Sequence, residues 1–203
     1  MIDTAARPLD FAAARKAMLD SQLRTSGVNE AFVLTRMGAV PREDFVPAEA
    51  RGYCYMDRAI PLPGGGTLAQ PVAHGKLLML ARPEMDERVL VVDNGNGYLG
   101  ALVAPLAGTC ERVSVADAAG GKPGGKAGSS YDLVIVDGAV ERIPAALARR
   151  VAQGGRVVTG LLDKGVARLA IGRPSGKDIA FRVVEDIALP RLAAFDAPKE
   201  WSF

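Results

Sequence analysis

The sequence is poor in the residues that metal and redox sites need. Its 203 residues include one histidine, two cysteines and one tryptophan. Cys54 and Cys110 lie outside any Cys-x-x-Cys spacing, and only His74 could join them as a metal ligand. A structural zinc site needs four such ligands, so none is expected. A disulfide framework is not expected either, which favours a reducing compartment. We expect His74 to be an ordinary helix residue without a catalytic role.

An excess of charge of one sign and long apolar runs are also missing. The 25 basic and 23 acidic residues give a net charge of +2, which predicts neither a nucleic-acid partner nor a membrane partner. No stretch approaches the ~20 apolar residues that span a bilayer. Residues 1–24 carry charged side chains where a signal peptide would have an apolar core. We therefore expect a cytoplasmic protein, and the sequence leaves its oligomeric state open.

The order of the remaining segments is typical of an α/β protein with a mainly parallel sheet. Helices are expected over residues 10–27, 29–40, 72–81, 98–106 and 144–151. Buried strands are expected over residues 88–93, 113–117, 131–137 and 156–162, followed by a terminal antiparallel hairpin of residues 166–171 and 179–184. We expect one domain over residues 1–203, in which a helical segment, 1–82, precedes an α/β core, 83–203.

A glycine-rich turn follows the first expected strand. Residues Asp93–Gly100 read Asp-Asn-Gly-Asn-Gly-Tyr-Leu-Gly, and Asp117 follows Gly97 by 20 positions. Glycines let the backbone approach a ligand, and the amides that open a helix attract anions. The spacing matches a dinucleotide fingerprint with its ribose-binding acid at Asp117, expected at the end of the second strand. It indicates an adenosine-containing cofactor, either NAD or S-adenosylmethionine, and a ligand-free tight turn is the alternative.

Four blocks near the N-terminus carry a family resemblance. They are, in chain order, Met18–Arg24, Val40–Pro47 (VPREDFVP), Tyr55–Pro61 and Thr67–Pro71 (TLAQP). In sequence, order and spacing they resemble the protein-L-isoaspartate O-methyltransferase family, whose last block reads TISQP. Further on, Val89–Tyr98, Tyr131–Ala139 and Gly154–Arg156 resemble that family's glycine motif and its fourth and fifth strands. The likeness covers nearly the whole chain and favours S-adenosylmethionine over NAD.

The resemblance implies a Rossmann-like methyltransferase sheet and a repair reaction. The methyl group of S-adenosylmethionine would pass to the carboxylate of isoaspartyl residues in proteins or peptides. Such a carboxylate is already ionised at neutral pH, so the reaction needs no general base, which suits a chain with a single histidine. Transfer then depends on positioning and on the exclusion of water. Residues 1–82 would form the substrate side and residues 83–203 the cofactor-binding core.

The resemblance also assigns site residues. The amides near Gly95, Gly97 and Tyr98 would hold the methionine end of the cofactor, with Asp93 beside them and Asp117 at the ribose. Asp137, at the end of the third strand, would lie near the transferred methyl group. The substrate pocket would be shaped by Thr67, Gln70 and Pro71.

The sequence departs from the family pattern in three ways. Ala69 stands where the family has a serine, whose hydroxyl is taken to contact the reacting carboxylate. Val91 replaces the acid before the first glycine, and Asp93 replaces that glycine itself; its carboxylate either substitutes for the lost acid or blocks the turn. Residues 118–130, rich in glycine, stand where the family has a helix, a strand and another helix. This deletion after the second strand should leave that strand as an exposed edge.

These departures leave a second hypothesis beside the enzyme. A homologue with impaired catalysis would keep the fold and serve as a binding or interaction protein. A third hypothesis is an NAD-linked oxidoreductase, which rests on the glycine spacing alone. The sequence offers it no proton-transfer residue near the turn beyond Tyr98.

Overall fold

The computed structural model describes residues 9–122 and 128–198, and the N-terminal part of these is helical. Helix α1 (Phe11–Met18) begins where the Ala13 amide donates a 2.9 Å hydrogen bond to the Asp10 carboxylate. The chain continues as a π turn and a 3₁₀ turn, Leu19–Leu23 and Arg24–Ser26, and stops at Gly27, whose φ is 82°. The expected helix over residues 10–27 is therefore confirmed, with an irregular second half.

Two further helices complete the N-terminal part. Helix α2 (Ala31–Ala39) ends before Pro41, as expected, and α3 spans Pro71–Ala81. Between them, where no regular element is expected, lie two 3₁₀ helices and a short antiparallel pair of strands. These are Arg42–Phe45, Ala48–Tyr53, β1 (Ile60–Pro61) and β2 (Thr67–Leu68). None of the helices in residues 9–122 and 128–198 is long and apolar enough to cross a membrane.

The centre of the fold is a six-stranded sheet with the order β4-β3-β5-β6-β7-β8. Its strands are β3 (Arg88–Asp93), β4 (Thr109–Ser114), β5 (Tyr131–Val140), β6 (Val151–Asp163), β7 (Val166–Ser175) and β8 (Asp178–Asp186). The first four are parallel and the last two form an antiparallel hairpin, which confirms the α/β prediction. The helices of the core are α4 (Tyr98–Val103), α5 (Val115–Ala119) and α6 (Ala145–Ala148).

Two expected elements have wrong bounds. The second strand spans Thr109–Ser114 instead of residues 113–117, and Asp117 lies in the first turn of α5 instead of at the end of a strand. The cause is local, because the Ser114 hydroxyl accepts a 3.0 Å bond from the Asp117 amide and so starts a helix there. The helix expected over residues 144–151 is only Ala145–Ala148, and Val151 already pairs with Tyr131 in the sheet.

The deletion after the second strand has the expected consequence. Within the described residues, strand β4 pairs only with β3 and forms one edge of the sheet. The short helix α5 follows it, and the chain then returns to β5 on the other side of β3. Residues 123–127, in the middle of the glycine-rich connection, lie outside the described residues. Charged side chains on β4, Glu111 and Arg112, discourage pairing with another edge.

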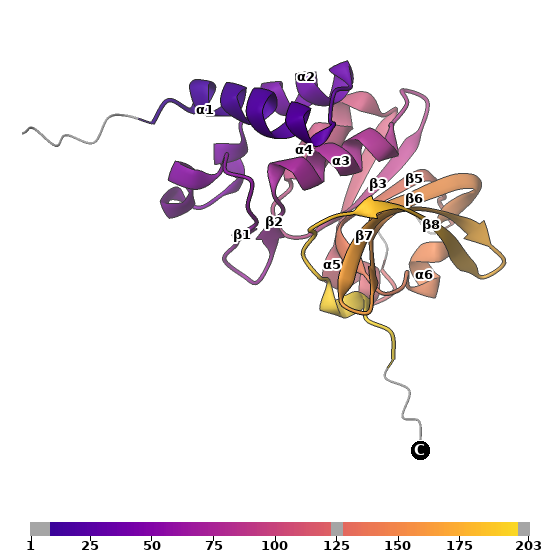
Figure 1. The fold of residues 1–203 in the computed structure, drawn as a ribbon. Helices are drawn as coiled ribbons and strands as arrows, with labels where there is room; N and C mark the ends of the chain where they lie inside the picture. The colour runs from indigo at the N-terminus through magenta and orange to yellow at the C-terminus, as the bar shows by residue number, and fades with distance from the viewer. Residues whose placement is uncertain (1–8, 123–127, 199–203) are drawn as a thin grey trace, which may run out of the picture.

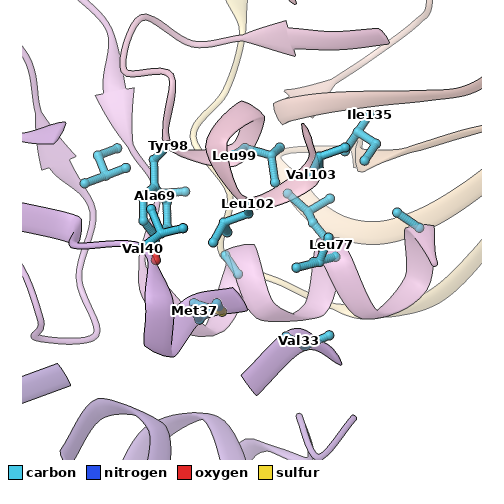
Figure 2. Close-up of a cluster of buried hydrophobic side chains, with 14 of the residues drawn as sticks. Val33, Met37, Val40, Ala69, Leu77, Tyr98, Leu99, Leu102, Val103 and Ile135 are labelled. Atoms are coloured by element: carbon cyan, nitrogen blue, oxygen red, sulfur yellow. The ribbon is translucent and has the colours of Figure 1, made fainter. Parts of the chain in front are cut away.

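Buried side chains fill both faces of the sheet. Along β3, Val89 and Val91 face the N-terminal helices, while Leu90 and Val92 join a second cluster with α5 and α6. Figure 1 shows α1, α2 and α3 gathered on one side of the sheet and α5 and α6 on its other side. On the first side α2, α3 and α4 pack together through apolar side chains (Figure 2), among them Met37, Leu77 and Leu102. The helical segment and the sheet thus share one core.

A core leucine on α3 tests this arrangement. Leu77 is fully buried, so Leu77→Ala leaves a cavity between the N-terminal helices and the sheet. We expect the free energy of unfolding in urea to fall by about 2–5 kcal/mol. The matched change Leu9→Ala, at a side chain that is 59% exposed, should alter it by less than about 0.5 kcal/mol. Equal effects of the two changes would show that α3 does not share the core.

Candidate functional site

The glycine-rich turn lies at the carboxyl end of β3 and is organised by Asp93. One oxygen of that carboxylate, Oδ1, accepts hydrogen bonds from the amides of Gly95, Asn96 and Gly97 at 3.0, 3.1 and 3.0 Å. Gly95 and Gly97 have φ values of 91° and 76°, which side-chain-bearing residues rarely adopt. Three successive amides therefore converge on one negatively charged oxygen. We call Gly95–Gly97 with these three donors the amide cradle.

The segment expected to shape the substrate pocket contacts this turn directly. The Thr67 amide donates to the Asn94 carbonyl at 3.2 Å, and the Thr67 carbonyl accepts from the Asn94 and Asn96 side chains at 3.3 and 3.4 Å. Gly66 lies so close that a Cβ there would be 2.3 Å from the Asn94 carbonyl oxygen. Two segments that the resemblance assigns to substrate and cofactor thus meet at the end of β3.

A row of buried polar side chains runs beneath the turn. His74 Nε2 lies 3.0 Å from Asp137 Oδ1, and His74 Nδ1 lies 3.2 Å from Arg42 Nη1. A guanidinium only donates, so Nδ1 accepts and the imidazole proton is on Nε2, which donates to Asp137. Asp137 Oδ2 accepts from the Asn96 side chain at 3.3 Å. Arg42, His74 and Asp137 are all fully buried, and a neutral imidazole joins the two charges.

Arg42 connects this row to the rest of the N-terminal segment. Its guanidinium donates to the carbonyls of Cys54, at 2.6 Å, and of Ala69, and it lies 5.1 Å from the centre of the Tyr98 ring. Burial lowers the pKa of the guanidinium from its ordinary value. The sequence alone does not reveal this role, because Arg42 stands only within a family block and His74 has the surroundings of an ordinary helix residue.

A second polar cluster, formed by Arg15, Glu43 and Tyr55, contacts the backbone of Arg42. The Tyr55 hydroxyl donates to the Glu43 carboxylate and accepts from Arg15 Nε at 2.7 Å and from the Arg42 amide at 3.1 Å. Arg15 also forms an ion pair with Glu43 at 2.9 Å. Burial and then the hydrogen bond to Glu43 raise the pKa of the Tyr55 phenol well above its usual range.

The remaining site residues predicted from the sequence lie outside the amide cradle. Asp117 is exposed on α5, and its carboxylate accepts from the Ser114 hydroxyl at 2.7 Å. Ser114 is the register partner of Asp93, so Asp117 lies within a helical turn of the strand end where it was expected. Gln70 is the cap residue of α3 and Pro71 its buried first residue. Ala69 is fully buried in the apolar cluster beside Val40 and Tyr98 (Figure 2).

Two glycines of the fingerprint make room for an arginine. A Cβ on Gly97 would be 2.3 Å from Arg112 Nη1, and a Cβ on Gly100 would be 2.4 Å from Arg112 Cδ. Arg112 extends from β4 across the start of α4, and its Nη1 lies 3.4 Å from Asp93 Oδ2. Both oxygens of Asp93 therefore contact donors of this chain.

Two solved structures have a similar arrangement of elements. A protein-L-isoaspartate O-methyltransferase from Plasmodium falciparum, in complex with S-adenosyl-L-homocysteine, is similar with a TM-score of 0.66 and 15% identity over 91% of this chain and 98% of that one. Another solved protein-L-isoaspartate O-methyltransferase is similar with a TM-score of 0.70 and 16% identity. The match covers 90% of this chain and 67% of that one. These likenesses show the fold alone, a Rossmann-like α/β fold that this chain shares with these two methyltransferases.

Sequence comparison narrows the class to one family. Residues 13–118 match the family described as protein-L-isoaspartate(D-aspartate) O-methyltransferase. Protein-L-isoaspartate O-methyltransferase 1 of Rhodopseudomonas palustris is 31% identical over 87% of this chain and 82% of its own length. The protein-L-isoaspartate O-methyltransferase of Methylorubrum populi is 31% identical over 82% of this chain and 84% of its own length. The chain belongs to the protein-L-isoaspartate(D-aspartate) O-methyltransferase family, as the four sequence blocks predicted.

The buried row yields a prediction about stability. Arg42→Met removes the cation and leaves the buried Asp137 carboxylate without its compensating charge, so we expect a loss of about 3–5 kcal/mol in the free energy of unfolding. The double variant Arg42→Met with Asp137→Asn should lose less than the sum of the two single changes, measured by urea unfolding. Additive losses would contradict the coupling through His74. Lys16→Met, in an exposed pair with Asp20, serves as the control and should change little.

The tyrosines yield a prediction about pH. Burial raises the phenol pKa of Tyr55, Tyr98 and Tyr131 in the folded chain, whereas unfolded tyrosines ionise near pH ~10. The folded state thus holds these protons more tightly, so its stability is fully present below pH ~10 and declines as the pH rises further. Absorbance titration should show three phenols ionising later in the folded chain than in denaturant. Tyr55→Phe should remove one of them, and ionisation of all tyrosines near pH ~10 in the folded chain would contradict the assignment.

Proposed function

We propose that this chain transfers the methyl group of S-adenosylmethionine to the carboxylate of isoaspartyl residues in proteins or peptides. Family membership supports the reaction class, because the related enzymes are named for it over most of the chain. The observation that carries the proposal is the contact of Thr67 with Asn94 and Asn96, which brings the substrate-side segment against the glycine turn. The second hypothesis, a homologue kept only for binding, is not favoured by these relatives.

The amide cradle is our candidate for one end of the cofactor. S-adenosylmethionine carries a carboxylate on its methionine end, and the bonds of the Asp93 carboxylate to the three amides support the cradle as a site for such a group once Asp93 has moved away. We propose the cradle for that end and Asp117 for the ribose hydroxyls. When bound, the cofactor supplies a sulfonium methyl group that a carboxylate can attack.

The chain's own contribution is to position the substrate and exclude water. A substrate carboxylate is ionised at neutral pH and needs no proton removed. We propose that Gln70, beside Thr67 and Pro71, orients this carboxylate from the start of α3. Both oxygens of Asp137 are engaged by His74 and Asn96, so we assign Asp137 the task of holding the glycine turn through Asn96.

Methyl transfer to matched peptides tests the proposal. Radiolabelled S-adenosylmethionine should label a peptide that contains isoaspartate and leave the same peptide with aspartate unlabelled. Gln70→Ala should lower kcat/KM by about ten- to a hundred-fold, the range expected for the loss of one hydrogen bond to a charged group. Gln153→Ala changes an exposed glutamine near the amino end of β6, away from the turn, and should have no effect.

Labelling of neither peptide by folded protein would refute the proposed reaction. Labelling of both peptides equally would keep methyl transfer and refute the isoaspartyl substrate. An equal effect of the two glutamine changes would remove Gln70 from the pocket.

A further inference from the structure

Asp93 occupies the place that a glycine has in the related motif, and its side chain does what a ligand would do there. Its Oδ1 accepts from all three amides of the cradle. Its Oδ2 lies 3.4 Å from Arg112 Nη1. The Asp93 side chain is only 16% exposed, so the carboxylate lies against the turn instead of extending into solvent. The cradle is therefore saturated by the chain itself.

Two carboxylates cannot share this cradle. Each backbone N–H donates one strong hydrogen bond, and the three N–H groups already converge on a single oxygen. A second carboxylate at hydrogen-bond distance from the same amides would also meet the negative charge of Asp93 at close range. A ligand carboxylate can bind there only after Asp93 has rotated away.

We propose that Asp93 is an internal competitor for the cofactor's carboxylate and thereby sets the affinity of this chain for S-adenosylmethionine. This inference rests on the proposed function, because it concerns the same amides. When the competent state is a minor fraction of the population, the apparent dissociation constant is the intrinsic one divided by that fraction. Rotation of Asp93 out of the cradle gives up three charge-assisted hydrogen bonds, so the competent fraction is small.

Removal of the competitor should strengthen binding of ligands that carry the carboxylate. Asp93→Gly leaves the three amides free and restores the residue type of the related motif. We expect it to lower the dissociation constant of S-adenosyl-L-homocysteine by at least about ten-fold, which corresponds to about 1.4 kcal/mol. Asp93→Asn keeps the shape of the side chain without its charge. Its dissociation constant for S-adenosyl-L-homocysteine should lie between those of wild type and Asp93→Gly.

A second ligand separates competition from general loosening of the turn. 5′-Methylthioadenosine shares the adenosine and sulfur of S-adenosyl-L-homocysteine but lacks its amino-acid end. Asp93→Gly should therefore leave the dissociation constant of 5′-methylthioadenosine unchanged. Titration calorimetry measures both ligands on wild type and variants, and circular dichroism with thermal melting confirms that each variant is folded. Asp86→Gly, an exposed aspartate in the turn before β3, is the matched control and should change neither affinity.

The outcomes separate this inference from the proposed function. If wild type binds S-adenosyl-L-homocysteine and Asp93→Gly binds it no more tightly, competition is refuted and the methyltransferase proposal stands. If Asp93→Gly binds both ligands more tightly by the same factor, competition for the carboxylate is also refuted. If neither folded protein binds S-adenosyl-L-homocysteine at millimolar concentration, both proposals fail. Should Asp93→Gly not fold, the Asp93→Asn titration decides by the same criteria.

Discussion

The arrangement of the site depends on one buried interaction, in which His74 joins the Arg42 guanidinium to the Asp137 carboxylate. Both charges are fully buried, and a buried charge without a partner is very costly. The three residues come from a 3₁₀ helix, from α3 and from β5, so these elements can take only the relative placement that keeps the row intact. Apolar packing alone tolerates small shifts of helices on a sheet, whereas a buried chain of directional hydrogen bonds does not.

The same requirement for satisfied polar groups explains how the chain accommodates its departures from the family pattern. An aspartate at the first glycine position would be an obstacle if it projected from the turn, but here it accepts from the turn's own amides. The lost strand leaves β4 with an unpaired edge, and the Ser114 cap ends that strand early by starting α5. In both places a short polar side chain accepts from nearby backbone amides, Asp93 from those of the turn and Ser114 from the first turn of α5.

Much of the fold could be predicted from the sequence, because its main signals are local. Strand β3 coincides with the predicted residues 88–93, since a continuous apolar run marks a strand buried on both faces. The end of β4 could not be placed, because Val113 and Val115 continue the apolar alternation through Ser114, and only the hydroxyl's bond to the Asp117 amide stops it. The row of Arg42, His74 and Asp137 joins residues 32 and 63 positions apart. No periodicity or spacing reports contacts of that kind, and a single histidine in an apolar helix has no local signal that identifies its partners.

The amide cradle and the buried row are linked through Asn96, and that link bears on what happens when Asp93 moves. The Asn96 side chain donates to the Thr67 carbonyl and to Asp137, and it accepts from the Tyr98 amide at 2.8 Å. None of these bonds involves Asp93. Two sets of bonds therefore meet in this turn, one made by Asp93 from the side of β3 and one made by Asn96 from the side of the buried row. When the Asp93 carboxylate leaves, the bonds of Asn96 still hold the middle residue of the cradle. Part of the cradle is then already placed when a ligand carboxylate arrives, which lowers the ordering cost of binding.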